Sequence, residues 1–424
     1  MPRRRRFGQV IPMRNVDIER ALGEFHPRSE VYLQGGVGEP LALRNLLKSR
    51  PAALEGVRLI SCLLPQMNEF DYAALSAGAD LTVFMLPATL RSSFEAGRVR
   101  VRPLCYSQIV AALEAGPAFD LAVLQVTPPD ADGLCSFGPC TDFAPLVWRR
   151  ARRRLAFVNP RLPRTSRGPT IPVSALDVAI DATGPFIAPE EAPPSPQLAA
   201  IAERVADLVP DGVAIQTGIG GAPAAAVGRL HERRNLKVRS GMVTPGYRRL
   251  ADAGALDPAG RHVTGLAFGD EDFMAWAAAT FEFADARTTH GALALAEAGP
   301  LYAINSALEV DLFGQVNLEW RDGRLFSGLG GAPDFARAAR RSGGRAILAL
   351  PSTGRGGTSR IVPRLATPTV SLPREDADLI VTEHGAADLT GADLDARAAR
   401  LISVAAPDHR EPLAAAWKDI RKGL

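Results

Sequence analysis

The sequence predicts two related α/β domains with mostly parallel sheets and a cleft between them. Three observations lead to this fold class. Apolar runs of strand length alternate with helical runs on both sides of a proline-rich stretch, and a strand–glycine-turn–helix unit occurs twice. Strands that are apolar throughout and separated by helices are typical of parallel sheets buried in α/β layers. The third observation is the length, because 424 residues exceed what a single core usually holds.

The repeated unit consists of a strand, a glutamine, a glycine turn and a helix. Its two copies read VYLQGGVGEP, residues 31–40, and VAIQTGIGGAP, residues 213–223. Four residues match at a constant offset of 182, namely Val31, Gln34, Gly36 and Gly38 with Val213, Gln216, Gly218 and Gly220. Repetition of one supersecondary unit indicates two related halves rather than one dinucleotide-binding domain.

The boundary between the halves follows from proline. Four prolines fall within eight residues of the stretch Ile187–Ala200. Proline donates no backbone hydrogen bond and is excluded from helix interiors, so this stretch predicts an extended connector. We therefore expect an N-terminal domain over residues 1–187, a linker over 188–197 and a C-terminal domain over 198–424.

Each half contains the expected alternation of strands and helices. Before the linker, the expected strands are VRLISCLL, DLTVFML, DLAVLQV and RLAFVN, and the expected helices are EPLALRNLLKSR and YSQIVAALEAG. After the linker, the expected strands are VAIQTGI, HVTGLAF, LYAINSAL, RAILAL and ADLIVTEHG. Runs of this length and composition predict strands of buried parallel sheets.

The composition excludes several classes of protein. Apolar residues make up 46% of the chain, charged residues 22%, and the net charge is only +3, so no nucleic acid partner is expected. No apolar run reaches the length of a membrane span, and Arg3–Arg6 precedes no signal-peptide core. The four cysteines form no CxxC motif. We therefore expect a cytoplasmic protein without disulfides and without a metal.

The glycine loop at residues 213–223 does not fit the common nucleotide-binding motifs. The third small position of a dinucleotide fingerprint falls on Pro223, and no acidic residue ends the following strand. No Gly-Lys-Ser/Thr sequence follows, which excludes a Walker A loop. A tight turn at a helix N-terminus remains, and its backbone N–H groups favour an anion. The anion is either a phosphate or the oxyanion of a carbonyl under attack.

Longer motifs in both halves are more specific than the glycine loop. They are VTPPDADGLCSFG (126–138), VNPRLPRT (158–165), INSALEVDLFGQVNLE (304–319), SGLGGAPDFARAARRSGGRAILALPST (327–353), VTEHGAADLTG (381–391) and SVAAPDHREPL (403–413). Together they resemble, in order and over nearly the whole chain, the acetyl-CoA hydrolase/transferase family. This class I CoA-transferase group contains 4-hydroxybutyrate and acetate CoA-transferases. The resemblance implies acyl-CoA and a small acceptor as substrates, and we expect a homodimer.

The resemblance also assigns roles to particular residues. QTGIGGAP is similar to the family loop that lines the acyl end of the site, and the NSALEVDLFGQ segment is similar to its core signature. The residues implied for catalysis are Gln216, Gly218, Gly220, Gly221, His290 and Asn305. SGLGGAPDF is similar to the coenzyme A-binding segment, whose glycines let backbone approach the ligand. The residues implied for coenzyme A binding are Gly328, Gly330, Gly331, Asp334 and Phe335.

Two departures from the family pattern fall on catalytic positions. Family members carry a catalytic glutamate that attacks the acyl-CoA and then holds coenzyme A as a glutamyl thioester. The segment that corresponds to it, RSGMVTPG, has Gly241 at the glutamate position. In RTTHGAL, His290 occupies the position of an asparagine that donates a hydrogen bond to the reacting carbonyl. The resemblance therefore implies an altered mechanism.

Three hypotheses follow. In the first, which we favour, water or an acceptor attacks the thioester directly, as in a thioesterase or an acyltransferase. His290 would then act as oxyanion donor, as general base near neutral pH, or as both. In the second, a CoA-transferase recruits another carboxylate, with Glu271 in GDEDF as the candidate. In the third, the chain binds coenzyme A without catalysis. Cys135 and Ser136 are further candidate nucleophiles, although a free cysteine more often serves packing.

Overall fold

The computed structural model describes residues 15–185, 187 and 193–424, and the chain forms two compact units. Unit 1 comprises Met1–Leu104, Gln108–Pro189 and Gly265–Arg287, and unit 2 comprises Cys105–Ser107, Glu190–Thr264 and Thr288–Leu424. The sequence suggests one uninterrupted domain on each side of the linker, whereas a short segment of each half groups with the other unit. Residues 188–192 of the expected linker and the run Arg3–Arg6 lie outside the described residues.

Unit 1 is built on a seven-stranded sheet in the order β4-β3-β2-β1-β5-β7-β9, and all neighbouring strands pair in parallel. The strands are β1 (Glu30–Leu33), β2 (Arg58–Ile60), β3 (Asp80–Val83), β4 (Val99–Val101), β5 (Leu121–Val126), β7 (Arg153–Val158) and β9 (Val178–Asp181). An antiparallel pair is formed by β6 (Leu134–Ser136) and β8 (Thr170–Pro172). The helices are α1 (Asn15–Leu22), α2 (Leu41–Ser49), α3 (Arg91–Glu95), α5 (Ala144–Val147) and α9 (Glu271–Thr280), and β13 (Glu282–Phe283) follows α9.

The main sheet of unit 2 contains, in order, β11-β10-β14-β19-β21-β22. Its strands are β10 (Ala214–Thr217), β11 (Lys237–Val243), β14 (Leu301–Ser306), β19 (Arg345–Ala349), β21 (Leu379–Thr382) and β22 (Gly385–Asp388), and only the last pair is antiparallel. The helices are α6 (Pro196–Leu208), α7 (Gly221–Arg229), α8 (Pro245–Asp252), α11 (Ala292–Ala296), α12 (Ala332–Arg341), α13 (Leu394–Ser403) and α14 (Pro407–Arg421).

Short strands and the junction elements complete the chain. Unit 2 adds a small sheet in the order β16-β15-β20 and a hairpin of β17 and β18. Their bounds are β15 (Glu309–Asp311), β16 (Val316–Asn317), β17 (Trp320–Arg321), β18 (Arg324–Leu325) and β20 (Ile361–Val362). Boundaries between the two units fall within three elements, α4 (Tyr106–Ala115), β12 (Val263–Ala267) and α10 (Ala286–Thr289).

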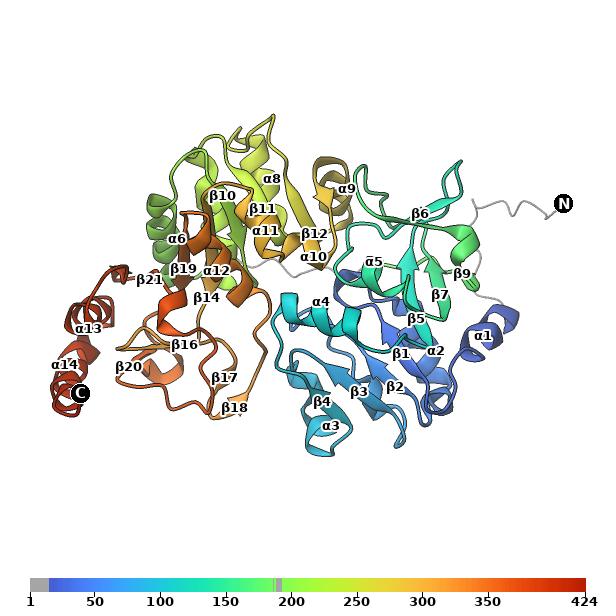
Figure 1. The fold of residues 1–424 in the computed structure, drawn as a ribbon, viewed down its shortest axis with the longest axis horizontal. Coiled ribbons are helices and arrows are strands. Elements are labelled where there is room, and N and C mark those ends of the chain that lie inside the picture. Colours follow the sequence, from blue (N-terminus) through green and yellow to red (C-terminus); the bar gives the residue numbers. More distant parts are fainter. Residues whose placement is uncertain (1–14, 186, 188–192) are drawn as a thin grey trace. The chain divides into compact units, whose positions relative to one another are not determined.

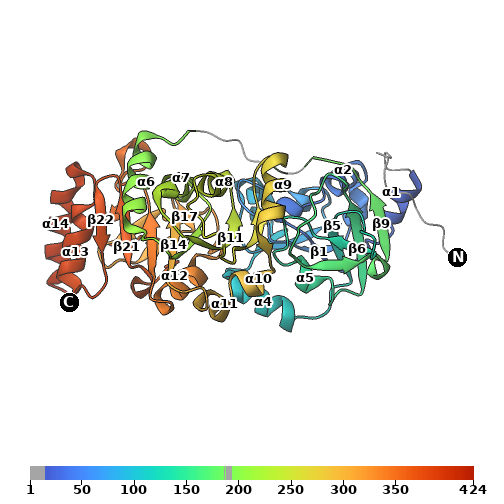
Figure 2. The same ribbon diagram turned by 90° about the horizontal axis from the view of Figure 1, so that it is seen from above.

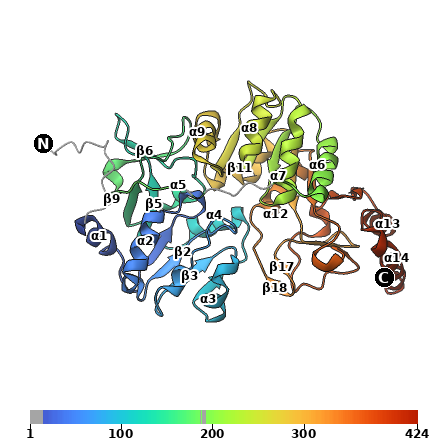
Figure 3. The same cartoon turned by 180° about the vertical axis from the view of Figure 1, so that it is seen from behind.

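Each main sheet is covered by helices on both faces. In unit 2, α6, α7 and α8 lie side by side on one face, while α11 and α12 lie on the other (Figures 2 and 3). In unit 1, α2 and α5 lie on opposite sides of the sheet (Figure 2). Helices α13 and α14 pack together (Figure 1) and lie beyond the β22 edge (Figure 2). Because both faces are covered, central strands are buried along their whole length, namely all six residues of β5 and all four of β10.

The predicted α/β class with mostly parallel sheets is confirmed. Each expected strand overlaps an observed one, although β7 begins at Arg153, one residue before the expected run. The expected helices EPLALRNLLKSR and YSQIVAALEAG contain α2 and α4. Both copies of the glycine-turn unit occupy sheet interiors, since β1 lies between β2 and β5, and β10 lies between β11 and β14. The sequence did not predict the small sheets, whose strands of two or three residues are too short to show an alternation.

The N-terminus of α6 falls inside the expected linker. The helix begins at Pro196, where the missing N–H costs nothing, and the Ser195 hydroxyl accepts a hydrogen bond from Leu198 N at 3.3 Å.

Among the described residues, no helix combines the length and apolar character that a membrane crossing requires.

Candidate functional site

Most of the implied catalytic residues lie at the carboxyl edge of the unit 2 sheet. Strands β11, β10 and β14 are parallel neighbours, so their carboxyl ends meet at one edge. Gly241 lies near the end of β11, the glycine loop follows β10, and Asn305 is the penultimate residue of β14. In open α/β sheets this edge is where ligands bind.

Gln216 and Asn305 form a reciprocal amide pair at this edge. Gln216 Nε2 donates to Asn305 Oδ1 at 3.2 Å, and Asn305 Nδ2 donates to Gln216 Oε1 at 3.0 Å. The two side chains are only 2% and 7% exposed. A buried amide needs such partners, because an unpaired one costs about 1–3 kcal/mol. The pair therefore ties the end of β10 to the end of β14.

The glycine loop packs too closely against β14 to accommodate side chains. A Cβ on Gly218 would overlap Asn305 Oδ1, and a Cβ on Gly220 would overlap Ser306 Oγ. Gly220 also has φ +131°, a conformation that other residues rarely adopt. The loop leads directly into α7, which begins at Gly221. Backbone N–H groups at such a helix start are suited to an anion or an oxyanion.

His290 lies in a closed environment of rings and glycine backbone. The side chain is 4% exposed. Its ring centroid is 4.2 Å from that of Tyr106 and 4.7 Å from that of Phe335. Thr289 Oγ1 lies 2.9 Å from Nδ1, within hydrogen-bonding distance. The imidazole edge that carries Nε2 and Cε1 faces the backbone of Gly241, the residue that the family resemblance aligns with the glutamate.

Burial determines the protonation state of this histidine. Desolvation lowers the pKa of His290 from 6.5 to about 3. The imidazole is therefore neutral at physiological pH, with one ring nitrogen donating and the other accepting. A general base works best with a pKa near the operating pH, which His290 lacks. The role as a neutral hydrogen-bond donor, analogous to that of asparagine, is compatible with this environment.

The implied coenzyme A segment begins α12, and a short strap is attached to it. Asp334 Oδ1 accepts a hydrogen bond from Ser107 Oγ at 2.5 Å, and Oδ2 accepts one from Ser107 N at 3.1 Å. Tyr106 N donates to Gly330 O at 3.2 Å. Desolvation raises the pKa of the Asp334 carboxyl above its ordinary value, although the Ser107 hydrogen bonds oppose the rise. Asp334 thus anchors the strap, residues 105–107.

The glycines of this segment differ in their surroundings. Gly330 has φ +57°, and no atom lies within 4 Å of the place a Cβ would take. Gly331 has an ordinary φ of −93°, but a Cβ there would lie 2.5 Å from His290 Nε2. Phe335, which the resemblance assigned to coenzyme A binding, packs against the His290 ring. The coenzyme A segment and His290 therefore belong to one packed cluster.

Sequence reasoning missed two members of this cluster. Tyr106 and Thr289 contact His290 directly, but Tyr106 lies in no motif that indicates a site, and Thr289 was given no role within RTTHGAL. Tyr106 starts α4, at more than 180 positions from His290, so only the folded chain brings the rings together. Thr289 precedes His290 in the sequence, and this adjacency was the only available signal.

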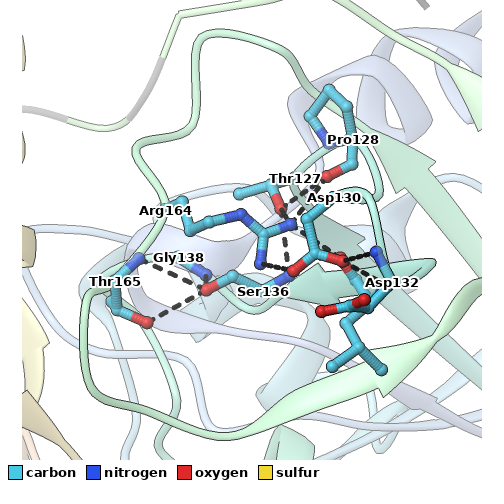
Figure 4. A network of polar contacts seen from close by, with 9 residues as sticks. Thr127, Pro128, Asp130, Asp132, Ser136, Gly138, Arg164 and Thr165 are labelled. Atoms are coloured by element: carbon cyan, nitrogen blue, oxygen red, sulfur yellow. Dashed lines mark hydrogen bonds and ion pairs between the residues drawn. The ribbon is translucent and has the colours of Figure 1, made fainter.

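The alternative nucleophiles, Cys135 and Ser136, lie in buried surroundings in unit 1. Burial raises the pKa of the Cys135 thiol to about 11, so it is protonated at neutral pH. The fully buried Ser136 Oγ accepts a hydrogen bond from Gly138 N at 3.0 Å and contacts Thr165 Oγ1 at 3.0 Å (Figure 4). In the same network Arg164 is bound by Asp130 at 3.1 Å (Figure 4).

The carboxylate of Glu271, the candidate substitute for the family glutamate, has an ion-pair partner. Glu271 begins α9 in unit 1 and forms an ion pair with Arg161. The residue is exposed to solvent, as expected for the charged first turn of a helix. This exposed, ion-paired environment is that of an ordinary surface carboxylate.

Comparison with known proteins extends over most of the chain. Residues 13–186 match the acetyl-CoA hydrolase/transferase N-terminal domain, and residues 269–417 match the C-terminal domain of the same family. The 4-hydroxybutyrate coenzyme A transferase of Clostridium kluyveri is 31% identical over 410 residues, covering 94% of this chain and 96% of that protein.

Solved structures of similar proteins show the same fold. RipA from Yersinia pestis aligns with a TM-score of 0.88 at 29% identity, covering 95% of this chain and 97% of that one. A 4-hydroxybutyrate CoA-transferase from Porphyromonas gingivalis aligns with a TM-score of 0.78 at 28% identity, covering 96% and 97% of the two chains.

The lowered pKa of His290 predicts how stability depends on pH. Between pH 6.5 and about 3, the unfolded chain binds a proton at this residue and the folded chain does not. The free energy of unfolding should therefore fall with falling pH, by about 1.4 kcal/mol per unit from His290 alone. Denaturant unfolding across this range, compared with His290→Asn, isolates the contribution.

In this comparison, the slope of the wild-type protein should exceed that of His290→Asn. Equal slopes for the wild type and His290→Asn would show that the imidazole is not held neutral.

Proposed function

The chain belongs to the acetyl-CoA hydrolase/transferase family and is an acyl-CoA transferase- or hydrolase-like enzyme, and from this premise we propose that it acts on acyl-CoA by direct attack, without an enzyme-bound glutamyl intermediate. The observation that carries the proposal is the surroundings of Gly241. This residue has no side chain, and the His290 imidazole fills the space beside its backbone. A carboxylate nucleophile therefore has no place at this position.

In the proposed reaction, water or a small acceptor attacks the thioester carbonyl. The carbon–sulfur bond breaks, the proton of the nucleophile passes through solvent to the departing sulfur, coenzyme A leaves as the thiol, and the acyl group forms an acid or a new acyl product. Negative charge develops on the carbonyl oxygen in the transition state. The Gly218 N–H is bonded to Ile304 O at 2.8 Å, so the backbone N–H groups of residues 219–221, together with the neutral His290, are the proposed donors to that oxygen. Preorganised donors of this kind stabilise it strongly.

The position of coenzyme A is part of the proposal. Gly330 offers an open place beside the backbone, and α12 begins immediately after Gly331. A helix N-terminus favours an anionic group such as a phosphate of the cofactor. Asp334 acts indirectly in this scheme, because its carboxylate holds Ser107 and leaves the backbone of the glycine turn to face the ligand.

Kinetics and trapping test direct attack. A glutamyl mechanism gives ping-pong kinetics and a covalent enzyme–coenzyme A species. Direct attack predicts sequential kinetics for two substrates, no coenzyme A adduct by intact-protein mass spectrometry, and activity that survives borohydride in the presence of acyl-CoA. A borohydride-reduced carboxyl on any residue, with loss of activity, would replace this proposal by a relocated carboxylate such as Glu271.

Substitution of His290 separates its two proposed roles. Asparagine donates a hydrogen bond but accepts no proton near pH 7, so His290→Asn should retain most of the turnover if the ring acts as donor. His290→Ala should lose a factor on the order of 10² to 10³, as for other oxyanion donors. The pH–rate profiles of the wild type and of His290→Asn should have the same shape between about pH 5 and 8.

The contrary outcomes are equally definite. If both variants lose activity alike, the ring acts as a base despite its environment. If turnover cannot be detected in the wild type with any acyl-CoA while coenzyme A still binds, the chain is a coenzyme A-binding protein without catalysis. The burial of His290 and its pKa of about 3 are the observations that favour this second function.

A matched pair of glycine substitutions tests coenzyme A binding. Gly330→Asn adds a side chain to the open place before α12, and asparagine tolerates the positive φ of this position. The coenzyme A dissociation constant, measured by calorimetry, should rise at least about tenfold, or about 1.4 kcal/mol. Gly343→Asn is the control, because Gly343 has φ +76° and equally open surroundings after the other end of α12. Equal affinities would remove the turn from the site.

A further inference from the structure

The glycines at 241 and 331 are required by space and not by backbone conformation. Neither has a positive φ, so an ordinary residue would suit the backbone at both positions. A Cβ on Gly241 would lie 2.8 Å from His290 Cε1 and 2.9 Å from Nε2. A Cβ on Gly331 would lie 2.5 Å from Nε2 and 2.6 Å from Cδ2. All four distances are shorter than ordinary van der Waals contact between such atoms.

The imidazole has no room to move away from such a Cβ. Tyr106 and Phe335 pack against it with tilted rings, at ring-centroid distances of 4.2 and 4.7 Å. Thr289 Oγ1 holds the Nδ1 side at 2.9 Å. Tyr106 itself is fixed, because its N–H is bonded to Gly330 O and its neighbour Ser107 is bonded to Asp334. A close-packed interior of this kind resists even the addition of one methyl group.

We propose that His290 and Gly241 form one steric unit, in which the imidazole excludes every side chain at position 241 and thereby determines the mechanistic class of the site. The atoms that exclude a Cβ at this position are Cε1 and Nε2. Asparagine lacks both, because its side chain ends one bond beyond Cγ. The two departures from the family pattern, glycine for glutamate and histidine for asparagine, are thus a single coupled change.

The coupling has a chemical consequence that extends the proposed function. Shortening residue 290 to asparagine frees the space in which a side chain at 241 would begin. A glutamate introduced there would attack the acyl-CoA carbonyl through a carboxylate oxygen, forming an anhydride and releasing the coenzyme A thiolate. The thiolate would then attack the glutamyl carbonyl, release the acyl group as a carboxylate and leave a glutamyl thioester. Introduced with His290 in place, the same glutamate has no room.

A double-mutant cycle tests the steric unit without relying on activity. Gly241→Ala, in the presence of His290, should lower the folding equilibrium constant at least about tenfold, measured by denaturant unfolding. In the His290→Asn background, the same substitution should change it by less than about twofold. Gly228→Ala is the control: the nearest atom to its Cβ is Arg249 Nη2 at 3.7 Å, so its effect should be the same in both backgrounds. Equal costs of Gly241→Ala in both backgrounds would overturn the steric unit.

Mass spectrometry of intact protein tests the chemical consequence. After incubation with an acyl-CoA, the variant Gly241→Glu/His290→Asn should carry a coenzyme A adduct at residue 241 that borohydride removes. Gly241→Glu alone should carry none. An adduct on the single variant, or none on a folded double variant, would overturn the inference. The direct-attack proposal is decided separately, since it concerns sequential kinetics of the wild-type protein.

Discussion

The packing of one neutral imidazole is the constraint on which the rest of the candidate site depends. Two aromatic rings, from Tyr106 and Phe335, pack against His290, and the backbone of Gly241 and Gly331 lies beside its Nε2 atom. Interiors are packed as densely as molecular crystals, so a ring held in this way leaves no volume for a further side chain. The same enclosure removes water and keeps the ring uncharged.

This packing connects elements that are distant in the sequence. The strap at residues 105–107 is fixed to the start of α12 through Ser107 and Asp334, and the ring of Phe335 comes from the first turn of the same helix. Gly241 comes from near the carboxyl end of β11. A change in any of these elements should therefore alter the packing around the imidazole. Its position and its protonation state depend on all of them.

The two copies of the repeated unit show how tertiary context assigns different roles to one local motif. In unit 1, the Gln34 side chain donates to Cys140 O at 3.1 Å and accepts from Gln125 N at 2.8 Å, so it is satisfied by backbone. In unit 2, Gln216 is satisfied by the Asn305 side chain. Both glutamines are buried at the end of a central strand, and their partners depend on what packs beside that strand.

The sequence by itself determined the α/β class, the repeat and the positions of the main strands, because apolar runs and glycine turns depend on local chemistry. It also located the glycine loop, the coenzyme A segment and His290 as candidates, through motifs of contiguous residues. It left open whether His290 acts as a base or as a donor. Only the tertiary structure decided that the ring is buried, neutral and stacked on Tyr106, since burial and contact between distant residues arise from packing, which no local pattern encodes.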